Sequence, residues 1–199
     1  MKKDKILSKP FCIIWLAAAF IYGLVLPFCW GNNPASEMGT LSLLCEDRKI
    51  YFWIWGLLTA GSIFINSQYF YNKFSFKHKL YDIFGVLAII SVALVALTLG
   101  HSIEDWNPKR IAHWVATGMF IVFLLGSLAL YFLVNLKKHK SFGILFICML
   151  GIFASFLFIF IFIGKSALME MIPVALLEIF LFIINFTSLA PSESEVAAV

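Results

Sequence analysis

Hydrophobic residues fill six long runs of this chain, and short polar segments separate each run from the next. Each run approaches the roughly 20 residues that an α-helix needs to cross the hydrocarbon core of a bilayer. Six such runs use nearly the whole length, which leaves no room for a soluble domain. We therefore expect one all-α domain over 1–199, a bundle of six transmembrane helices. The predicted spans are about 11–30, 50–71, 80–100, 108–135, 142–164 and 167–189.

The composition supports a membrane location. Of the 199 residues, 62% are hydrophobic and 13% are charged, whereas a soluble domain is about 45–50% apolar and about 25% charged. A water-soluble fold of this size could not bury so much apolar surface, so lipid must cover it. The first run lacks a small-x-small cleavage site and ends in Pro27 to Trp30. We interpret it as a retained first helix and not as a cleaved signal peptide.

Basic residues are distributed unevenly between the two sides of the predicted bundle. With six alternating helices, ten fall on the side of the termini: Lys2, Lys3, Lys5, Lys9, Lys73, Lys77, Lys79, Lys137, Lys138 and Lys140. Five fall on the other side, here called the outer side: Arg48, Lys49, Lys109, Arg110 and Lys165. Because cytoplasmic loops carry the excess of Lys and Arg, both termini are predicted to be cytoplasmic. The inner loops can also meet anionic headgroups.

The net charge of +4 does not indicate a nucleic-acid partner. No basic groove interleaved with aromatic residues and no known nucleic-acid-binding module is present in the sequence. The expected partners are membrane lipids, together with other proteins in the membrane.

Local signals place several helix ends. Asn107 is predicted to cap the fourth span, which then begins at Pro108, and Ser166 is predicted to cap the sixth. Amphipathic rings favour the two membrane interfaces, and such rings stand at both ends of the second span. They are Tyr51, Trp53, Trp55, Tyr69 and Tyr71.

Small residues four positions apart predict where helices approach one another closely in lipid. The pairs are Ala96 with Gly100, Ala112 with Ala116, and Gly151 with Ser155. This is a packing signal and carries no functional information. No internal repeat and no matching pair of broken spans is detectable, which argues against a transporter built from inverted repeats.

Glu178 lies near the middle of the sixth span, among Val, Ala, Leu, Ile and Phe residues. A carboxylate at the centre of a transmembrane helix costs about 2.5–3.5 kcal/mol on insertion scales. We therefore expect Glu178 to face the bundle interior, to be protonated or to have a partner. It is either a proton-binding or catalytic carboxyl group, or a member of an interhelical hydrogen bond to Ser, Thr or Asn.

The other polar residues within or beside the spans that packing does not explain lie at the outer side. His113 is predicted in the first turns of the fourth span, and His101 and Asp105 follow the third span. With Glu37 of the first outer loop they are the candidate members of a polar cluster. We expect no cofactor. Zinc is the one alternative, because two imidazoles and carboxylates suit it, but no HExxH motif supports it. A metal-free polar site and simple interfacial hydrogen bonding are the alternatives.

Two other features have mainly structural interpretations. Glu170 follows Ser166 at the outer end of the sixth span, where a carboxylate is stabilised by the helix dipole. Cys29 and Cys45 bracket the first outer loop. A disulfide between them would pin this loop in an oxidising compartment, and the sequence leaves their state open.

Several of these residues form a known pattern. The sequence Ser36-Glu37-Met38-Gly39 resembles the S-D/E-x-G motif in the first outer loop of the damage-regulated autophagy modulator (DRAM) family. Arg48, His113 and Glu178 resemble that family's basic residue before the second span, its histidine in the fourth span and its glutamate in the last span. The resemblance covers about 11–189. Bacterial six-span membrane proteins of unknown function and a relative that remodels GPI-anchor lipids share this pattern.

The resemblance implies six spans, cytoplasmic termini and a role in lipid handling or membrane trafficking. The chain departs from the family at Glu37, which is usually Asp, and at Ile179, which is often Trp. We expect an integral multi-pass protein of the cell membrane if the source is bacterial, or of an endomembrane or lysosomal membrane if it is eukaryotic.

Three functions are compatible with this sequence. The first is lipid binding or regulation in membrane lipid handling, with Glu37, Arg48 and His113 at the mouth of a crevice. The second is an intramembrane lipid hydrolase or acyltransferase that uses the outer His and carboxylate cluster. The third is a small-solute or proton-coupled transporter that uses Glu178, with few other polar residues to help it.

Overall fold

The computed structural model describes residues 8–31, 33–35, 40–73, 79–98 and 107–187. All regular elements within these ranges are helices, and six of them are long and apolar enough to cross a membrane. The predicted all-α, six-helix, multi-pass architecture is therefore confirmed. The elements are α1 (Lys9–Val25), η1 (Leu26–Gly31), α2 (Leu41–Leu44), η2 (Glu46–Arg48), α3 (Lys49–Lys73), α4 (Lys79–Leu97), α5 (Pro108–Asn135), α6 (Lys140–Phe162) and α7 (Ala167–Phe186).

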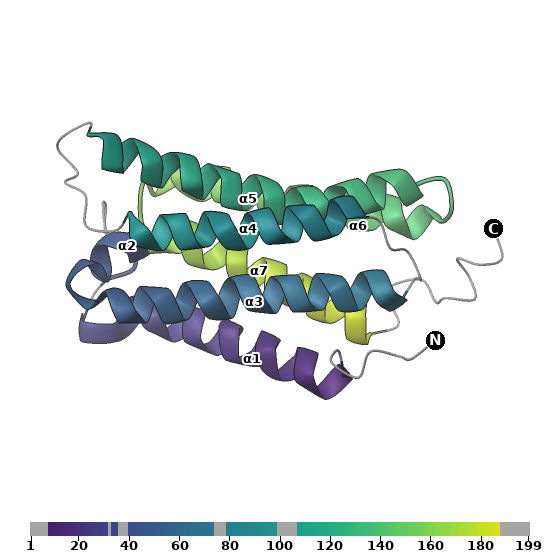
Figure 1. The fold of residues 1–199 in the computed structure, drawn as a ribbon, viewed down its shortest axis with the longest axis horizontal. Helices are drawn as coiled ribbons and strands as arrows, with labels where there is room; N and C mark the ends of the chain where they lie inside the picture. Colours follow the sequence, from purple (N-terminus) through teal and green to yellow (C-terminus); the bar gives the residue numbers. More distant parts are fainter. Residues whose placement is uncertain (1–7, 32, 36–39, 74–78, 99–106, 188–199) are drawn as a thin grey trace.

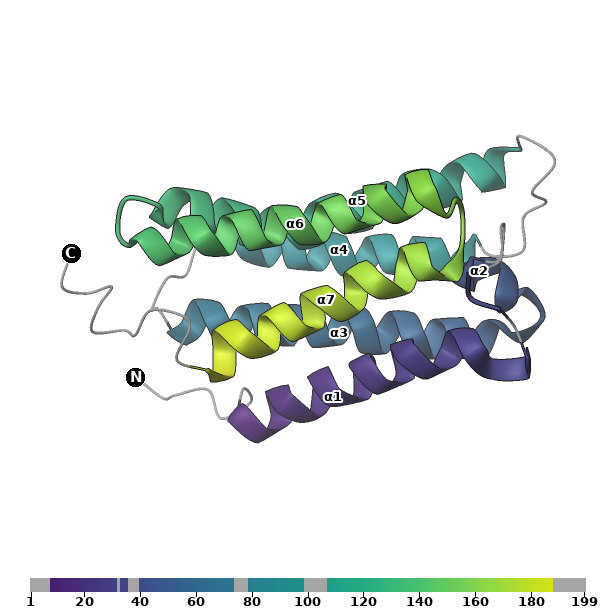
Figure 2. The same cartoon turned by 180° about the vertical axis from the view of Figure 1, so that it is seen from behind.

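The long helices run side by side, and the short helix α2 lies at one end of the bundle (Figure 1). The beginning of α1 and the end of α7 lie at the opposite end. The end with α2 is the outer end in the predicted orientation. α1 packs on α3, α4 on α5, and α6 on α7. Figure 2 shows that α7 crosses the bundle diagonally, from α6 at its outer end toward α1 and α3 at its inner end.

One of the two predicted helix starts has a clear local cause. The Asn107 side chain accepts a hydrogen bond of 2.9 Å from the Arg110 amide, and Pro108 is the first residue of α5, as predicted. Ser166 occupies the cap position of α7, but its hydroxyl makes no cap hydrogen bond. The third span is shorter than predicted. α4 ends at Leu97, and Thr98 lies in the turn that follows.

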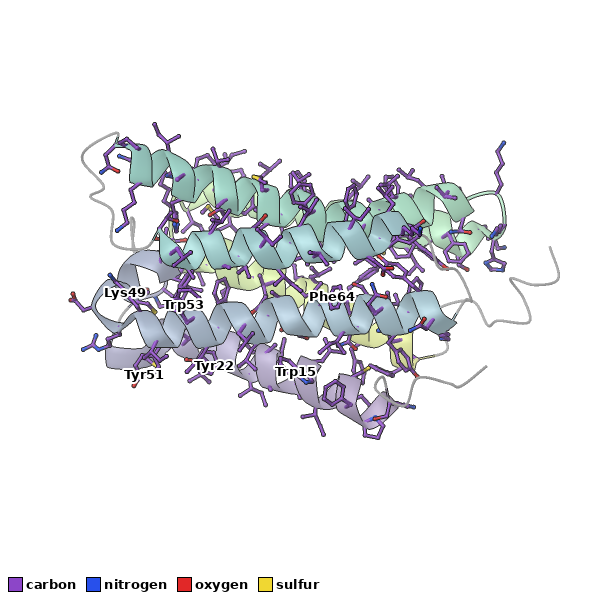
Figure 3. The ribbon with its side chains drawn as sticks, viewed as in Figure 1. Trp15, Tyr22, Lys49, Tyr51, Trp53 and Phe64 are labelled. Carbon is purple, nitrogen blue, oxygen red and sulfur yellow. The ribbon has the colours of Figure 1, made fainter. Side chains whose placement is uncertain are left out.

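Aromatic rings form much of the inner half of the core. Tyr71 donates a hydrogen bond of 3.1 Å to Ser127 Oγ, and its ring stacks on Tyr81 with centroids 4.8 Å apart. Tyr71 and Trp55 are core residues, 3% and 6% exposed, so their rings pack between helices. That they lie at the depth of the membrane interfaces stays a prediction. The polar edge of Tyr71 is satisfied inside the bundle. Tyr51 at the outer end of α3 is exposed, as an interfacial residue should be (Figure 3).

Close helix approaches occur at glycines that the small-residue pattern did not select. A Cβ added to Gly61 would lie 2.8 Å from the Trp15 ring, and one added to Gly85 would collide with the Phe64 ring (Figure 3). Gly151, by contrast, has no atom within 4 Å of such a Cβ. It lies on an exposed face of α6, so the predicted packing role of Gly151 is wrong.

Candidate functional site: an outer cavity between five helices

A cavity of about 140 Å³ opens inside the outer end of the bundle. Side chains of α3, α4, α5, α6 and α7 form its wall, together with the segment that begins α2. Most of the wall is apolar. Its polar lining residues are Thr40, Ser42, Arg110, His113, Thr117, Lys165 and Glu170.

Two cations line this cavity. Arg110 lies in the first turn of α5, and only 8% of its surface is exposed. Lys165 lies between α6 and α7, and its Nζ is 4.9 Å from the centroid of the Trp114 ring. This distance is within the range of a cation–π interaction, so the ring holds the ammonium group beside the cavity.

His113 lies one turn after Arg110 on α5 and is also buried. Its Nδ1 is 3.1 Å from the Thr98 hydroxyl, which donates to the Leu94 carbonyl at 2.7 Å. Thr98 Oγ1 and His113 Nδ1 share this hydrogen bond, and which of the two atoms donates depends on the tautomer of the imidazole. The contact holds the His113 ring, a group that can donate or accept a proton, at the cavity wall.

Glu170 faces the same cavity from α7. Its Oε2 accepts a hydrogen bond of 2.9 Å from the Leu41 amide, at the start of α2. Beside it, the Thr40 and Ser42 hydroxyls are 3.0 Å apart. Glu170 therefore ties α7 to the outer segment, a role beyond the dipole interaction that its position in the sequence suggested.

A second cavity, of about 60 Å³, continues the first one toward the middle of the bundle. Its wall is wholly apolar and comes from α5, α6 and α7. The two cavities adjoin because they share five lining residues: Phe120, Ile121, Phe156, Pro173 and Val174. Together they form a space that is polar at the outer end and apolar below.

The predicted outer cluster is found only in part. His113 lines the cavity, but Arg48 lies exposed on η2 and does not line it. Glu37, His101 and Asp105 lie outside the described residues. Sequence reasoning missed Arg110, although it stands three residues before His113 and so shares its helix face.

Lys165 and Glu170 were also missed. Each of them is separated from α5 by the whole of α6, and no periodicity connects them to the residues of α5. Lys165 and Glu170 line the cavity only because of how α7 packs in the bundle.

Glu178 is buried in α7, with 2% of its surface exposed, as its position in the sequence predicted. Neither of its carboxyl oxygens has a hydrogen-bond partner within the part of the chain that the structure describes. The interhelical hydrogen bond that was one interpretation of this residue is therefore not seen among these residues.

Among the described residues, no three His, Cys, Asp or Glu side chains gather closely enough to hold a metal ion. Since Glu37, His101 and Asp105 are not among them, the zinc hypothesis stays a prediction. Cys29 and Cys45 are free thiols, so the disulfide that the sequence left open is not formed. Burial, reinforced by nearby Glu170, raises the pKa of the Cys45 thiol to about 11.

The fold and the cavity define a class: a multi-pass α-helical membrane protein with a partly polar cavity at its outer end. No protein-family model matches the chain, and no curated protein or solved structure is significantly similar to it. The resemblance to the DRAM family therefore stays a prediction, carried by the short motifs quoted above.

Proposed function

We propose that this protein binds a membrane phospholipid in the outer cavity. The phosphate lies against Arg110 and Lys165, and one acyl chain enters the apolar cavity below. The observation that carries this proposal is that the two cavities adjoin at five shared wall residues, Phe120, Ile121, Phe156, Pro173 and Val174. A space with cations at one end and an apolar wall at the other matches the two halves of a phospholipid.

The position of the cations supports a phosphate ligand. Arg110 is in the first turn of α5, and Trp114 follows one turn later. Amphipathic aromatic rings prefer the level of the lipid headgroups, so the cations lie at the depth of lipid phosphates. A guanidinium group can bind two phosphate oxygens at once. Glu170, whose Oε2 already accepts from the Leu41 amide, is the one carboxylate in the described lining.

This proposal revises the first of the three functions from the sequence. The crevice is retained, but Arg110 replaces Arg48 as the arginine at its mouth. The resemblance to the DRAM family points in the same direction, since it implies a role in lipid handling. We therefore place the protein among those that bind or regulate membrane lipids.

The two arginines at the outer end provide a matched test. Arg110→Gln removes the cation from the cavity, and Arg48→Gln removes an exposed cation outside it. A charged hydrogen bond contributes about 1.5–3 kcal/mol, so Arg110→Gln should lower the phospholipid that co-purifies by at least about tenfold. Arg48→Gln should retain it. Quantitative lipid mass spectrometry on the purified variants measures this difference.

Equal loss in both variants would show that the cations act through the general surface charge, and unchanged phospholipid in both would contradict the proposal. Reloading delipidated protein with phospholipid or with diacylglycerol distinguishes the contribution of the phosphate from that of the acyl chains. Phospholipid should bind, and diacylglycerol, which lacks the phosphate, should bind weakly.

A lipid-modifying enzyme is the second candidate function, and the setting of His113 favours it. A base in such an enzyme must lie at the ligand, and His113 lines the cavity with its ring held by the hydrogen bond between Nδ1 and Thr98. Incubation with labelled phospholipids tests it. Turnover that His113→Ala abolishes would support the enzyme, and no turnover by the wild type would leave lipid binding alone.

A further inference from the structure

A row of polar side chains runs between α3 and α7 in the middle of the bundle. Thr59, Ser62 and Asn66 follow one face of α3 at helical spacing, and Glu178 and Asn185 follow one face of α7. None of the five is more than 5% exposed. Such residues are expensive inside a membrane and mark functional sites by default.

One hydrogen bond fixes the register of the two helices. Asn185 Nδ2 donates to the Asn66 carbonyl at 3.0 Å, and both helices run from the outer end to the inner end (Figure 1). Thr59 lies seven residues before Asn66 on α3, and Glu178 lies seven residues before Asn185 on α7. Seven residues are close to two helical turns. Thr59 and Glu178 therefore lie at one depth, about 10 Å outward of the contact at a rise of 1.5 Å per residue.

The unpaired atoms along this row are all oxygens. Asn66 Nδ2 donates to the Cys12 and Ser62 carbonyls at 3.3 and 2.9 Å, and Asn185 Nδ2 is also engaged. By contrast, six oxygens have no hydrogen-bond partner among the described residues. They are Thr59 Oγ1, Ser62 Oγ, Asn66 Oδ1, both Glu178 carboxyl oxygens and Asn185 Oδ1. The amide oxygens and the carboxyl group lack a donor, and the two hydroxyl groups have unused lone pairs, so the row offers oxygen ligands to a cation.

We propose that Glu178, Thr59 and Ser62 form a binding site for a sodium ion. A hard cation prefers oxygen ligands, and these side chains offer one carboxylate and two hydroxyls at the level of Thr59 and one turn below it. One carboxylate balances a single positive charge, which favours a monovalent ion over Ca²⁺ or Mg²⁺. Asn66 and Asn185 lie two turns further in and hold the register of the helices.

The outer cavity gives this site an entrance. Trp55 and Val174 line the cavity, and Thr59 and Glu178 each follow them by four residues, about one turn, on α3 and α7. The site therefore lies directly beneath the inner end of the cavity wall. In this proposal a cation from the outer side enters the cavity and then passes one further turn of α3 and α7, since Thr59 and Glu178 do not line the cavity themselves. The site does not depend on whether a lipid is the cavity's ligand.

The test is thermal unfolding of the purified full-length protein in detergent, at equal concentrations of NaCl, KCl and N-methylglucamine chloride. A bound ion stabilises the native state as its concentration exceeds its Kd. We expect the Tm of the wild type to rise with the logarithm of the Na⁺ concentration and to respond less to the other two cations. Glu178→Gln should abolish this response. Asp82→Asn, which alters an exposed carboxylate on α4, should retain it.

A response that is equal for the three salts, or that persists in Glu178→Gln, would overturn the proposal. A Tm that changes with pH and not with Na⁺ would also overturn it, because a proton would then be the ligand of Glu178. If Glu178→Gln does not fold, Thr59→Val provides the second measurement. Losing one ligand should weaken binding of ²²Na⁺ about tenfold, and unchanged binding would again contradict the site.

Discussion

At the outer end of the bundle, two arginines carry the same charge in different surroundings. Arg48 is exposed on η2, whereas Arg110 is 8% exposed and lines the cavity. The motif resemblance selected Arg48, because it stands near the S-E-x-G sequence. In the proposed function, Arg110 on the face of α5 that carries His113 takes the place of Arg48, since a ligand would meet a helix face and not a sequence motif.

Cys45 provides a prediction at the scale of one residue. Burial raises the pKa of its thiol to about 11, and the thiolate is the form that alkylating reagents attack. In a variant that keeps Cys45 as its sole cysteine, iodoacetamide at pH 8 should react about 100-fold more slowly than with an ordinary thiol of pKa about 9. The rate should rise about tenfold per pH unit until about pH 11. Mass spectrometry of the alkylated protein measures it.

The same variant unfolded in SDS is the control, because its thiol returns to an ordinary pKa. Equal rates at pH 8 in the native and unfolded states would mean that Cys45 is neither buried nor perturbed. The raised pKa of Cys45 also predicts how stability depends on pH. The native state holds the thiol proton more tightly than the unfolded state, so the stabilisation is fully present below about pH 9 and is lost as the pH rises to about 11.

Among the elements, α7 contributes to both proposed sites, as α3 also does. Its diagonal course carries Glu170, Pro173 and Val174 along the outer cavity and places Glu178 and Asn185 against α3. The six spans themselves were predictable, because hydropathy and length identify a transmembrane helix. Their mutual packing was not, since residues that face lipid and residues that face other helices are equally apolar. The cavity, which combines residues of five helices, was therefore out of reach of the sequence.

Substitution of two glycines by alanine tests how the helices pack. In Gly85→Ala on α4, the added methyl group must displace the Phe64 ring of α3, and such overpacking costs about 1–3 kcal/mol. Gly151→Ala on α6 meets no neighbouring atom within 4 Å and should change the unfolding free energy little. Unfolding in SDS compares the two variants. A larger loss for Gly151→Ala than for Gly85→Ala would contradict the observed packing of α3 on α4.

On the scale of the whole molecule, the distribution of Lys and Arg is the feature that orients the bundle. The beginning of α1 and the end of α7 lie at the same end of the molecule, as six alternating spans require. The positive-inside rule predicts that this end is cytoplasmic. The cavity and its cations would then open toward the outer leaflet, so the orientation would decide which lipids can reach the proposed site at Arg110.

A topology reporter inserted into the short connections tests the orientation. Insertion between α5 and α6, at 136–139, should report the cytoplasm, and insertion between α6 and α7, at 163–166, should report the opposite side. The two connections flank a single helix, so each serves as the control for the other. The reverse pattern would place the cavity at the cytoplasmic leaflet and contradict the charge argument.

An experimental density map of the protein in phospholipid nanodiscs tests the central claim most directly. We predict a lipid in the outer cavity, with its phosphate between Arg110 and Lys165 and an acyl chain along Phe120, Phe156 and Val174. The Arg110→Gln variant under the same conditions should lose this density. A cavity that holds water alone in the wild type, with lipids confined to the outer surface of the helices, would contradict the proposal.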